Sequence, residues 1–130
     1  MDIRAFFDSM DHELLMRAVR KHTQCQWMLL YIERWLKAPV QLEDGTCLPR
    51  DKGTPQGGVI SPLLANLFLH YAFDKWMQRS HPNKPFERYA DYVIVHCKSE
   101  YAAKQVLREI DQRMAECGLV LHPAKTKVVY

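Results

Sequence analysis

The strongest constraint on the fold is the run F-E-R-Y-A-D-Y-V-I-V-H-C at residues 86–97. Aromatic and β-branched residues favour strands, and a short acidic residue between two such stretches favours a turn. The run therefore predicts a hairpin formed by residues 86–90 and 92–97, with Asp91 at its tip. We interpret His96 and Cys97, at the end of the second strand, as buried packing residues.

Residues outside this run predict four helices, over 11–22, 26–36, 63–77 and 99–117. Asp8 and Asp11 provide an N-cap signal for the first helix, and Gly118 ends the last one. The second helix carries apolar and aromatic side chains at helical spacing, at Trp27, Leu30, Tyr31, Arg34 and Trp35.

The third helix, with Ser61 as its predicted cap, is apolar on almost all sides and is expected to be central and buried. A second hairpin is predicted around Asp44-Gly45, because this dipeptide suits a tight two-residue turn. The end of the chain, residues 119–130, reads as two short strands around a turn that contains Pro123. Helices and hairpins alternate irregularly, which favours an α+β fold over a doubly wound sheet.

Length and composition place the chain among ordinary globular proteins. A chain of 130 residues with 48% hydrophobic and 25% charged residues predicts one compact domain over 1–130. The net charge of +3 permits a polyanionic partner without requiring one. Four cysteines without a C-x-x-C pair, and no signal peptide or membrane segment, favour a soluble protein in a reducing cytoplasm.

Asp2 and Asp91 are the first candidates for metal chemistry. Phosphoryl transfer needs hard oxygen ligands held close together, and a strand end and a hairpin turn are two places that present them. Asp2 opens the stretch D-I-R-A-F-F-D, whose Ile3 and following aromatic residues suit a buried strand. The alternative is that Asp91 only forms the turn and that Asp2 is a solvated terminal residue.

A weaker candidate surrounds His12, which lies beside Asp8, Asp11 and Glu13. These residue types can bind a metal, but acidic residues are common in a first helical turn for electrostatic reasons. We therefore favour a structural role for this group.

Five stretches together resemble one enzyme family. They are D-I-R-A-F-F-D-S-M-D-H-E-L-L, Y-I-E-R-W-L-K-A-P, G-T-P-Q-G-G-V-I-S-P-L-L-A-N-L-F-L, R-Y-A-D and G-L-V-L-H-P-A-K-T-K, in this order. They resemble the palm of a bacterial group II intron-encoded reverse transcriptase, of the retron type, over residues 2–130. The resemblance implies a polymerase palm with a small antiparallel sheet, helices packed on its other face and an RRM/ferredoxin-like core.

For the catalytic centre, the resemblance implies that Asp2 and Asp91 are the catalytic, metal-binding carboxylates, with Mg²⁺ as the ion and Mn²⁺ as an alternative. Asp91 matches the first aspartate of a tyrosine-x-aspartate-aspartate turn. Tyr92 stands where the family has the second aspartate, and V-I-V-H-C follows in register. The site is therefore expected to have lost one carboxylate. Because a tyrosine is neutral near pH 7, this loss predicts weak metal binding and a large rate penalty.

For the nucleotide, the resemblance implies that Phe7 screens the sugar 2′ position and that Pro55, Gln56 and Gly57 border the incoming nucleotide and the template. Lys125 matches a lysine that is sometimes proposed to assist the pyrophosphate leaving group. The alternatives are a core phenylalanine, a simple turn before a helix and a solvated lysine.

The implied function is RNA-directed DNA polymerisation on an RNA template with a DNA primer, or action on intron RNA. We expect a truncated palm without fingers and thumb that is inactive alone. The alternative is a non-catalytic remnant that binds nucleic acid or self-associates, with a homodimer formed through uncovered palm surface. The basic residues expected to contact phosphates are Arg4, Arg50, Lys52 and Lys125.

Overall fold

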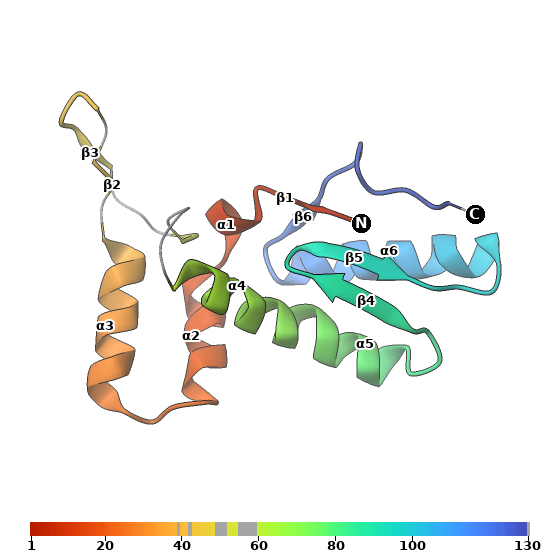
Figure 1. The fold of residues 1–130 in the computed structure, drawn as a ribbon, viewed down its shortest axis with the longest axis horizontal. Helices are drawn as coiled ribbons and strands as arrows, with labels where there is room; N and C mark the ends of the chain where they lie inside the picture. Colours follow the sequence, from red (N-terminus) through yellow and green to blue (C-terminus); the bar gives the residue numbers. More distant parts are fainter. Residues whose placement is uncertain (39, 42, 49–51, 55–59, 130) are drawn as a thin grey trace. The chain divides into compact units, whose positions relative to one another are not determined.

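The computed structural model describes residues 1–38, 40, 41, 43–48, 52–54 and 60–129 (Figure 1). Its helices and short antiparallel strand pairs confirm the predicted α+β class. In chain order the elements are β1 (Ile3–Arg4), α1 (Phe6–Ser9), α2 (His12–Arg20), α3 (Gln26–Lys37), β2 (Val40–Gln41), β3 (Cys47–Leu48), α4 (Ser61–Leu69), the π-helical turn η1 (His70–Asp74), α5 (Lys75–Ser80), β4 (Phe86–Tyr89), β5 (Tyr92–Val95), α6 (Glu100–Glu116) and β6 (Val120–Leu121).

Two compact units make up the chain. One comprises Phe7–Phe68, and the other combines Met1–Phe6 with the chain from Leu69 onward. We call them the helical unit and the sheet unit. The single-domain expectation for residues 1–130 stays a prediction. Among the described residues, no helix has the length and apolar character required to cross a lipid bilayer.

In the helical unit, α2 and α3 lie side by side (Figure 1). Asp11 caps α2 as predicted, since its Oδ1 accepts a hydrogen bond of 3.0 Å from the Leu14 amide. The hairpin around Asp44-Gly45 also forms, with Gly45 at φ +86° and the Thr46 amide bonded to Asp44 at 2.9 Å. Its connection is longer than the expected two-residue turn, because the last paired residues are Gln41 and Cys47. The buried face of α2 supplies much of the interior, through Leu15, Met16, Ala18 and Val19.

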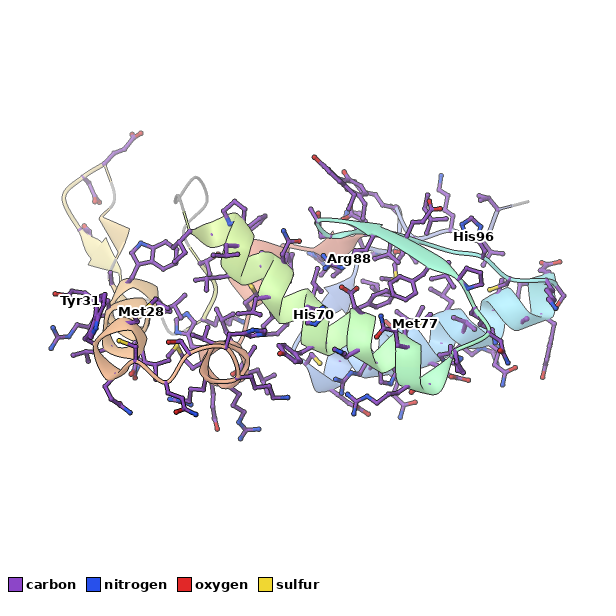
Figure 2. The ribbon with its side chains drawn as sticks, turned by 60° about the horizontal axis from the view of Figure 1, so that its bottom comes forward. Met28, Tyr31, His70, Met77, Arg88 and His96 are labelled. Atoms are coloured by element: carbon purple, nitrogen blue, oxygen red, sulfur yellow. The ribbon has the colours of Figure 1, made fainter. Side chains whose placement is uncertain are left out.

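One face of α3 is exposed. Trp27 and Tyr31 are each 64% exposed, and their rings make an edge-to-face contact with centroids 6.0 Å apart. Met28 and Leu30 are exposed as well, and Figure 2 labels Met28 and Tyr31 on this helix. Only Leu36 of α3 is buried, so the stripe seen in the sequence does not face the core.

The sheet unit contains two antiparallel strand pairs, β1 with β6 and β4 with β5. Met1 connects them: its amino group donates to the Val93 carbonyl at 2.9 Å, and its carbonyl accepts from the Val93 amide at 3.1 Å. This exchange of two bonds is the pattern of an antiparallel pair. The inner faces of these strands and the helices supply the core, which includes Ile3, Phe73, Met77, Val93, Val106, Ile110, Met114, Leu119 and Leu121.

The long apolar segment forms three consecutive helical pieces, α4, η1 and α5, with a π-helical turn in the middle. Burial is as predicted for most of its apolar residues, including Leu64, Phe68 and Phe73. Leu63 is an exception at 66% exposed, so the segment does not bury every side. The predicted α6 is confirmed, with Ser99 accepting the Ala102 amide at 3.1 Å and Gly118 at φ +76° after the helix.

Three local predictions were wrong. Phe6 and Phe7 lie in α1, because the strand that follows Asp2 ends at Arg4. Residues 126–129 form no strand after β6, so the described end of the chain has one strand rather than two. His96 is exposed, since β5 ends at Val95 and the chain leaves the sheet there (Figure 2).

Candidate active site

The β4–β5 hairpin places Asp91 at its tip, as predicted. Tyr89 and Tyr92 are directly paired, so Ala90 and Asp91 form a two-residue turn. Ala90 has φ +52°, a left-handed conformation that costs a residue with a Cβ about 1–2 kcal/mol. Two-residue hairpins need such positive φ values, and glycine or asparagine usually provides them. The turn is therefore formed against local preference.

Asp2 is held immediately before β1. Its side chain is 10% exposed, and its carbonyl accepts the His122 amide at 2.9 Å. Thr126 contacts the backbone of Asp2 at 3.5 Å, and its own amide bonds to the His122 carbonyl at 3.0 Å. The turn after β6 is thus hydrogen-bonded to the backbone of Asp2.

The two predicted carboxylates meet. Burial raises the pKa of Asp91 above that of a free aspartate, and the neighbouring Asp2 carboxylate raises it further. The backbone amide of Asp91 and the charge of Lys125 act in the opposite direction. Lys125 Nζ lies 3.6 Å from Asp2 Oδ2 on a side chain that is 61% exposed. Folding therefore brings together three predicted site residues that are far apart in the chain.

This pair of carboxylates fits a shared metal site. Magnesium is usually bound by one or two carboxylates together with water and substrate phosphates. Among the described residues, no group of three or more His, Cys, Asp or Glu side chains comes together. Asp2 and Asp91 are the pair of predicted site residues that could hold one divalent ion.

Tyr92 lies on the outer face of the hairpin, where it is 58% exposed. The antiparallel pairing of Met1 with Val93, continued by one residue, puts Asp2 opposite Tyr92. Directly opposed residues of this kind have Cα atoms about 4.5 Å apart. Position 92 is thus a cross-strand neighbour of Asp2. An aspartate at this position would add a third carboxylate next to Asp2 and Asp91, whereas Tyr92 does not.

The reverse transcriptase family, described as RNA-dependent DNA polymerase, matches the chain over residues 1–130. The chain belongs to this family. Protein YkfC of Escherichia coli strain K12 is 37% identical over 76 residues, which cover 58% of this chain and 19% of that protein. The group II intron-encoded protein LtrA of Lactococcus lactis subsp. cremoris is 41% identical over 69 residues, or 53% of this chain and 11% of that protein.

A third relative is the uncharacterized 91 kDa protein in the cob intron of Schizosaccharomyces pombe. It is 27% identical over 145 residues, with 99% of this chain and 17% of that protein covered. The matched part of this chain thus spans between 11% and 19% of the length of these relatives. The resemblance to group II intron-encoded reverse transcriptases is confirmed at the level of the family.

In the helical unit, Phe7 is half-buried in α1, and a short segment binds the backbone around it. The Thr54 amide donates to the Phe7 carbonyl at 2.6 Å, and the Gly53 amide donates to the Met10 carbonyl at 2.7 Å. This segment leads directly into the predicted nucleotide loop. Pro55, Gln56 and Gly57 themselves lie outside the described residues.

Other sequence candidates have structural or surface positions. His12 Nε2 lies 2.7 Å from the Gly53 carbonyl, so this imidazole supports the same segment. Arg4 and Lys52 are exposed, as phosphate-binding side chains must be, and Arg50 lies outside the described residues. The roles of these basic residues stay predictions.

Sequence reasoning missed the support behind the hairpin tip. Arg88 binds Asp74 through two hydrogen bonds of 2.8 Å, and it also donates to the Ala90 carbonyl at 2.8 Å. The sequence shows Arg88 immediately before Tyr89, but its partner Asp74 lies 14 residues earlier in a π-helical turn. No local pattern predicts that contact.

Proposed function

We propose that this chain is the palm of an RNA-directed DNA polymerase and that Asp2 and Asp91 are its metal-binding carboxylates. The observation that carries the proposal is the proximity of these two side chains, which are separated by most of the sequence and interact electrostatically in the sheet unit. Membership of the reverse transcriptase family supplies the class of reaction. The substrates proposed are an RNA template, a DNA primer and a deoxynucleoside triphosphate.

The residues of this chain would bind the ion, Mg²⁺ or Mn²⁺, through the oxygens of Asp2 and Asp91. A bound divalent ion would supply charge stabilisation to a reacting phosphate. Deprotonation of Asp91 is part of this proposal, because only the carboxylate form is a good ligand. Burial and Asp2 oppose that deprotonation in the metal-free chain.

Lys125 would act before and after metal binding. In the metal-free state it lies beside Asp2 and offsets part of the negative charge. A contact of 3.6 Å with a side chain that is 61% exposed contributes little to stability, so a divalent ion can replace it at small cost. Lys125 would then be available for a phosphate or for the pyrophosphate leaving group.

Polymerisation by the chain alone is not expected. The described residues bring together two carboxylates, and position 92 supplies an exposed phenol instead of a third. Phe7 and the loop of Pro55, Gln56 and Gly57 remain the proposed nucleotide contacts. A cytoplasmic location also stays part of the proposal.

A second candidate function is nucleic-acid binding without catalysis. The observation that favours it is the outer face of the hairpin, where Tyr89 and Tyr92 are 83% and 58% exposed. Aromatic side chains can stack on bases in a sequence-tolerant way. Weak binding that falls steeply with salt would be expected, with Lys125 and Arg4 as phosphate contacts. The predicted homodimer is kept as a further untested expectation.

The experiment that tests the catalytic proposal is the substitution Tyr92→Asp, which restores a carboxylate opposite Asp2. Thermal unfolding is followed with and without excess Mg²⁺ or Mn²⁺. An ion that binds only the folded state at about 100 times its Kd adds about 2.7 kcal/mol of stability. Without metal, the added negative charge is expected to destabilise the variant.

Tyr89→Asp is the matched control. Tyr89 is paired with Tyr92 on the other strand, so this variant adds the same negative charge to the hairpin at a position that is not opposite Asp2. Tyr92→Asp is expected to gain more metal-dependent stability than either the parent chain or Tyr89→Asp. If the two aspartate variants respond equally, the metal site is not assembled at Asp2 and Asp91. The nucleic-acid-binding function then becomes the better proposal.

A further inference from the structure

Behind the hairpin tip, a partly buried ion pair joins a helical turn to the backbone beside Asp91. We infer that Arg88, oriented by Asp74, is a positioning residue that holds the Ala90–Asp91 turn so that Asp91 faces Asp2. This inference rests on the proposed function in one respect: metal binding is the reason given for the position of Asp91. Its geometry stands on contacts within the sheet unit.

The Arg88 guanidinium uses three of its nitrogens. Nε and Nη2 each donate to one oxygen of the Asp74 carboxylate at 2.8 Å, and Nη1 donates to the Ala90 carbonyl at 2.8 Å. The planar guanidinium therefore fixes the direction from Asp74 to the turn. Figure 2 labels Arg88 at the hairpin, beside the helical stretch that carries His70 and Met77.

Both charges of this pair are largely removed from water. The side chains of Arg88 and Asp74 are 12% and 16% exposed, and Arg88 is paired across the hairpin with Val93, which is 2% exposed. A buried ion pair is poor evidence for stabilisation, because desolvation offsets most of the attraction. We therefore explain an arginine on the inner face of this hairpin by its effect on the orientation of the turn, rather than by a contribution to stability.

The helical turn that carries Asp74 is itself unusual. Asp74 ends the π-helical turn η1, and such turns change the order of backbone hydrogen bonds. Arg113 of α6 donates to the carbonyls of Ala72 and Tyr71 at 3.0 and 3.4 Å in this turn. The turn is therefore held from α6, while Asp74 extends the connection to the hairpin.

The contact with Ala90 acts where the backbone needs support. Ala90 has φ +52°, so the turn has an intrinsic tendency to relax into another conformation. A hydrogen bond from a fixed guanidinium to its carbonyl opposes that relaxation. Because Asp91 is the next residue, any change in the turn moves its carboxylate relative to Asp2.

The test compares Arg88→Lys with the control Arg79→Lys. Lysine keeps the charge beside Asp74, but one ammonium group cannot make the two-oxygen contact and also hold the Ala90 carbonyl in the same geometry. Arg79 of α5 belongs to the same unit and donates to the Lys75 carbonyl at 3.4 Å, but no described bond joins it to the hairpin or to Asp74. Each variant keeps the positive charge and replaces a guanidinium that donates to a backbone carbonyl.

Two readouts are taken by nuclear magnetic resonance. The first is the set of Overhauser contacts between the side chains of Asp91 and Asp2 in the metal-free chain. The second is line broadening by Mn²⁺ of signals from residues near Asp2 and Asp91, titrated to give a Kd. Removing a residue that supports a metal ligand commonly weakens metal affinity by about 10–100-fold.

We expect Arg88→Lys to lose the Asp2–Asp91 contacts and to weaken Mn²⁺ binding by at least about 10-fold, while Arg79→Lys changes neither. Retention of the contacts in Arg88→Lys, or their absence from the parent chain, would overturn the inference. If the parent shows the contacts but no Mn²⁺ broadening, the proposed metal function fails and the positioning role is judged on the contacts alone. If Arg88→Lys does not fold, Asp74→Asn, which keeps the side-chain shape, is judged by the same two criteria.

Discussion

Gly53 allows a test of how the segment before the predicted nucleotide loop is held. Its φ is +80°, and a Cβ at this position would lie 2.6 Å from the Phe7 carbonyl oxygen and 2.7 Å from backbone atoms of Asp8. Contacts below 3.0 Å to backbone cannot be relieved by a side-chain rotation. The substitution Gly53→Ala must therefore separate this segment from α1.

The expected loss of stability has two parts. The left-handed conformation costs a residue with a Cβ about 1–2 kcal/mol, and forcing extra atoms into packed structure costs about 1–3 kcal/mol. Alanine also lowers the conformational entropy of the unfolded chain, which offsets about 0.4–1 kcal/mol of this loss of stability. We therefore expect Gly53→Ala to destabilise the chain by about 2–4 kcal/mol, measured by urea unfolding with circular dichroism.

Gly45 and Gly118 provide controls, because both have positive φ but nothing lies within 4 Å of an added Cβ. Gly45→Ala and Gly118→Ala should show the backbone part alone, about 1–2 kcal/mol before the entropy correction. The difference from Gly53→Ala isolates the steric part. If all three variants lose the same stability, the close approach of Gly53 to Phe7 and Asp8 is not present in solution.

Three further outcomes follow from the site. Folding raises the pKa of Asp91 above the ordinary aspartate value of 3.8, so ionising this carboxyl lowers the stability of the folded chain as the pH rises above that value. Asp91→Asn should therefore be more stable than the parent at pH 7. In thermal melts below pH 3.8 the difference between the two proteins should vanish. Ala90→Gly should stabilise the chain by about 0.5–1 kcal/mol in urea unfolding, since it relieves a φ of +52° at some cost in entropy, and an unchanged midpoint would contradict the strained turn. Burial raises the pKa of the Cys117 thiol, so timed alkylation with mass-spectrometric mapping should modify it more slowly than the half-buried Cys25 and Cys97; equal rates would contradict its burial.

Local sequence signals accounted for the elements whose causes are local. The hairpin around Asp44-Gly45, the Asp11 cap and the end of α6 before Gly118 all formed as expected. Each depends on a side chain or a φ value within a few residues. The failures were at residues whose state depends on distant packing, such as Leu63, which the continuous apolar pattern placed in the core.

The sequence by itself determined the family, the α+β class and the two carboxylates, because motif order and residue type are properties of the chain alone. It also determined that Tyr92 stands where the resemblance implies an aspartate. Only the tertiary structure decided that Asp2 and Asp91 meet and that Lys125 lies 3.6 Å from Asp2. The same holds for the Asp74–Arg88 pair behind the turn. Asp74 and Arg88 are 14 positions apart, and Asp2 lies near the opposite end of the chain from Lys125. Strand register and a π-helical turn, rather than local sequence preference, bring these residues together.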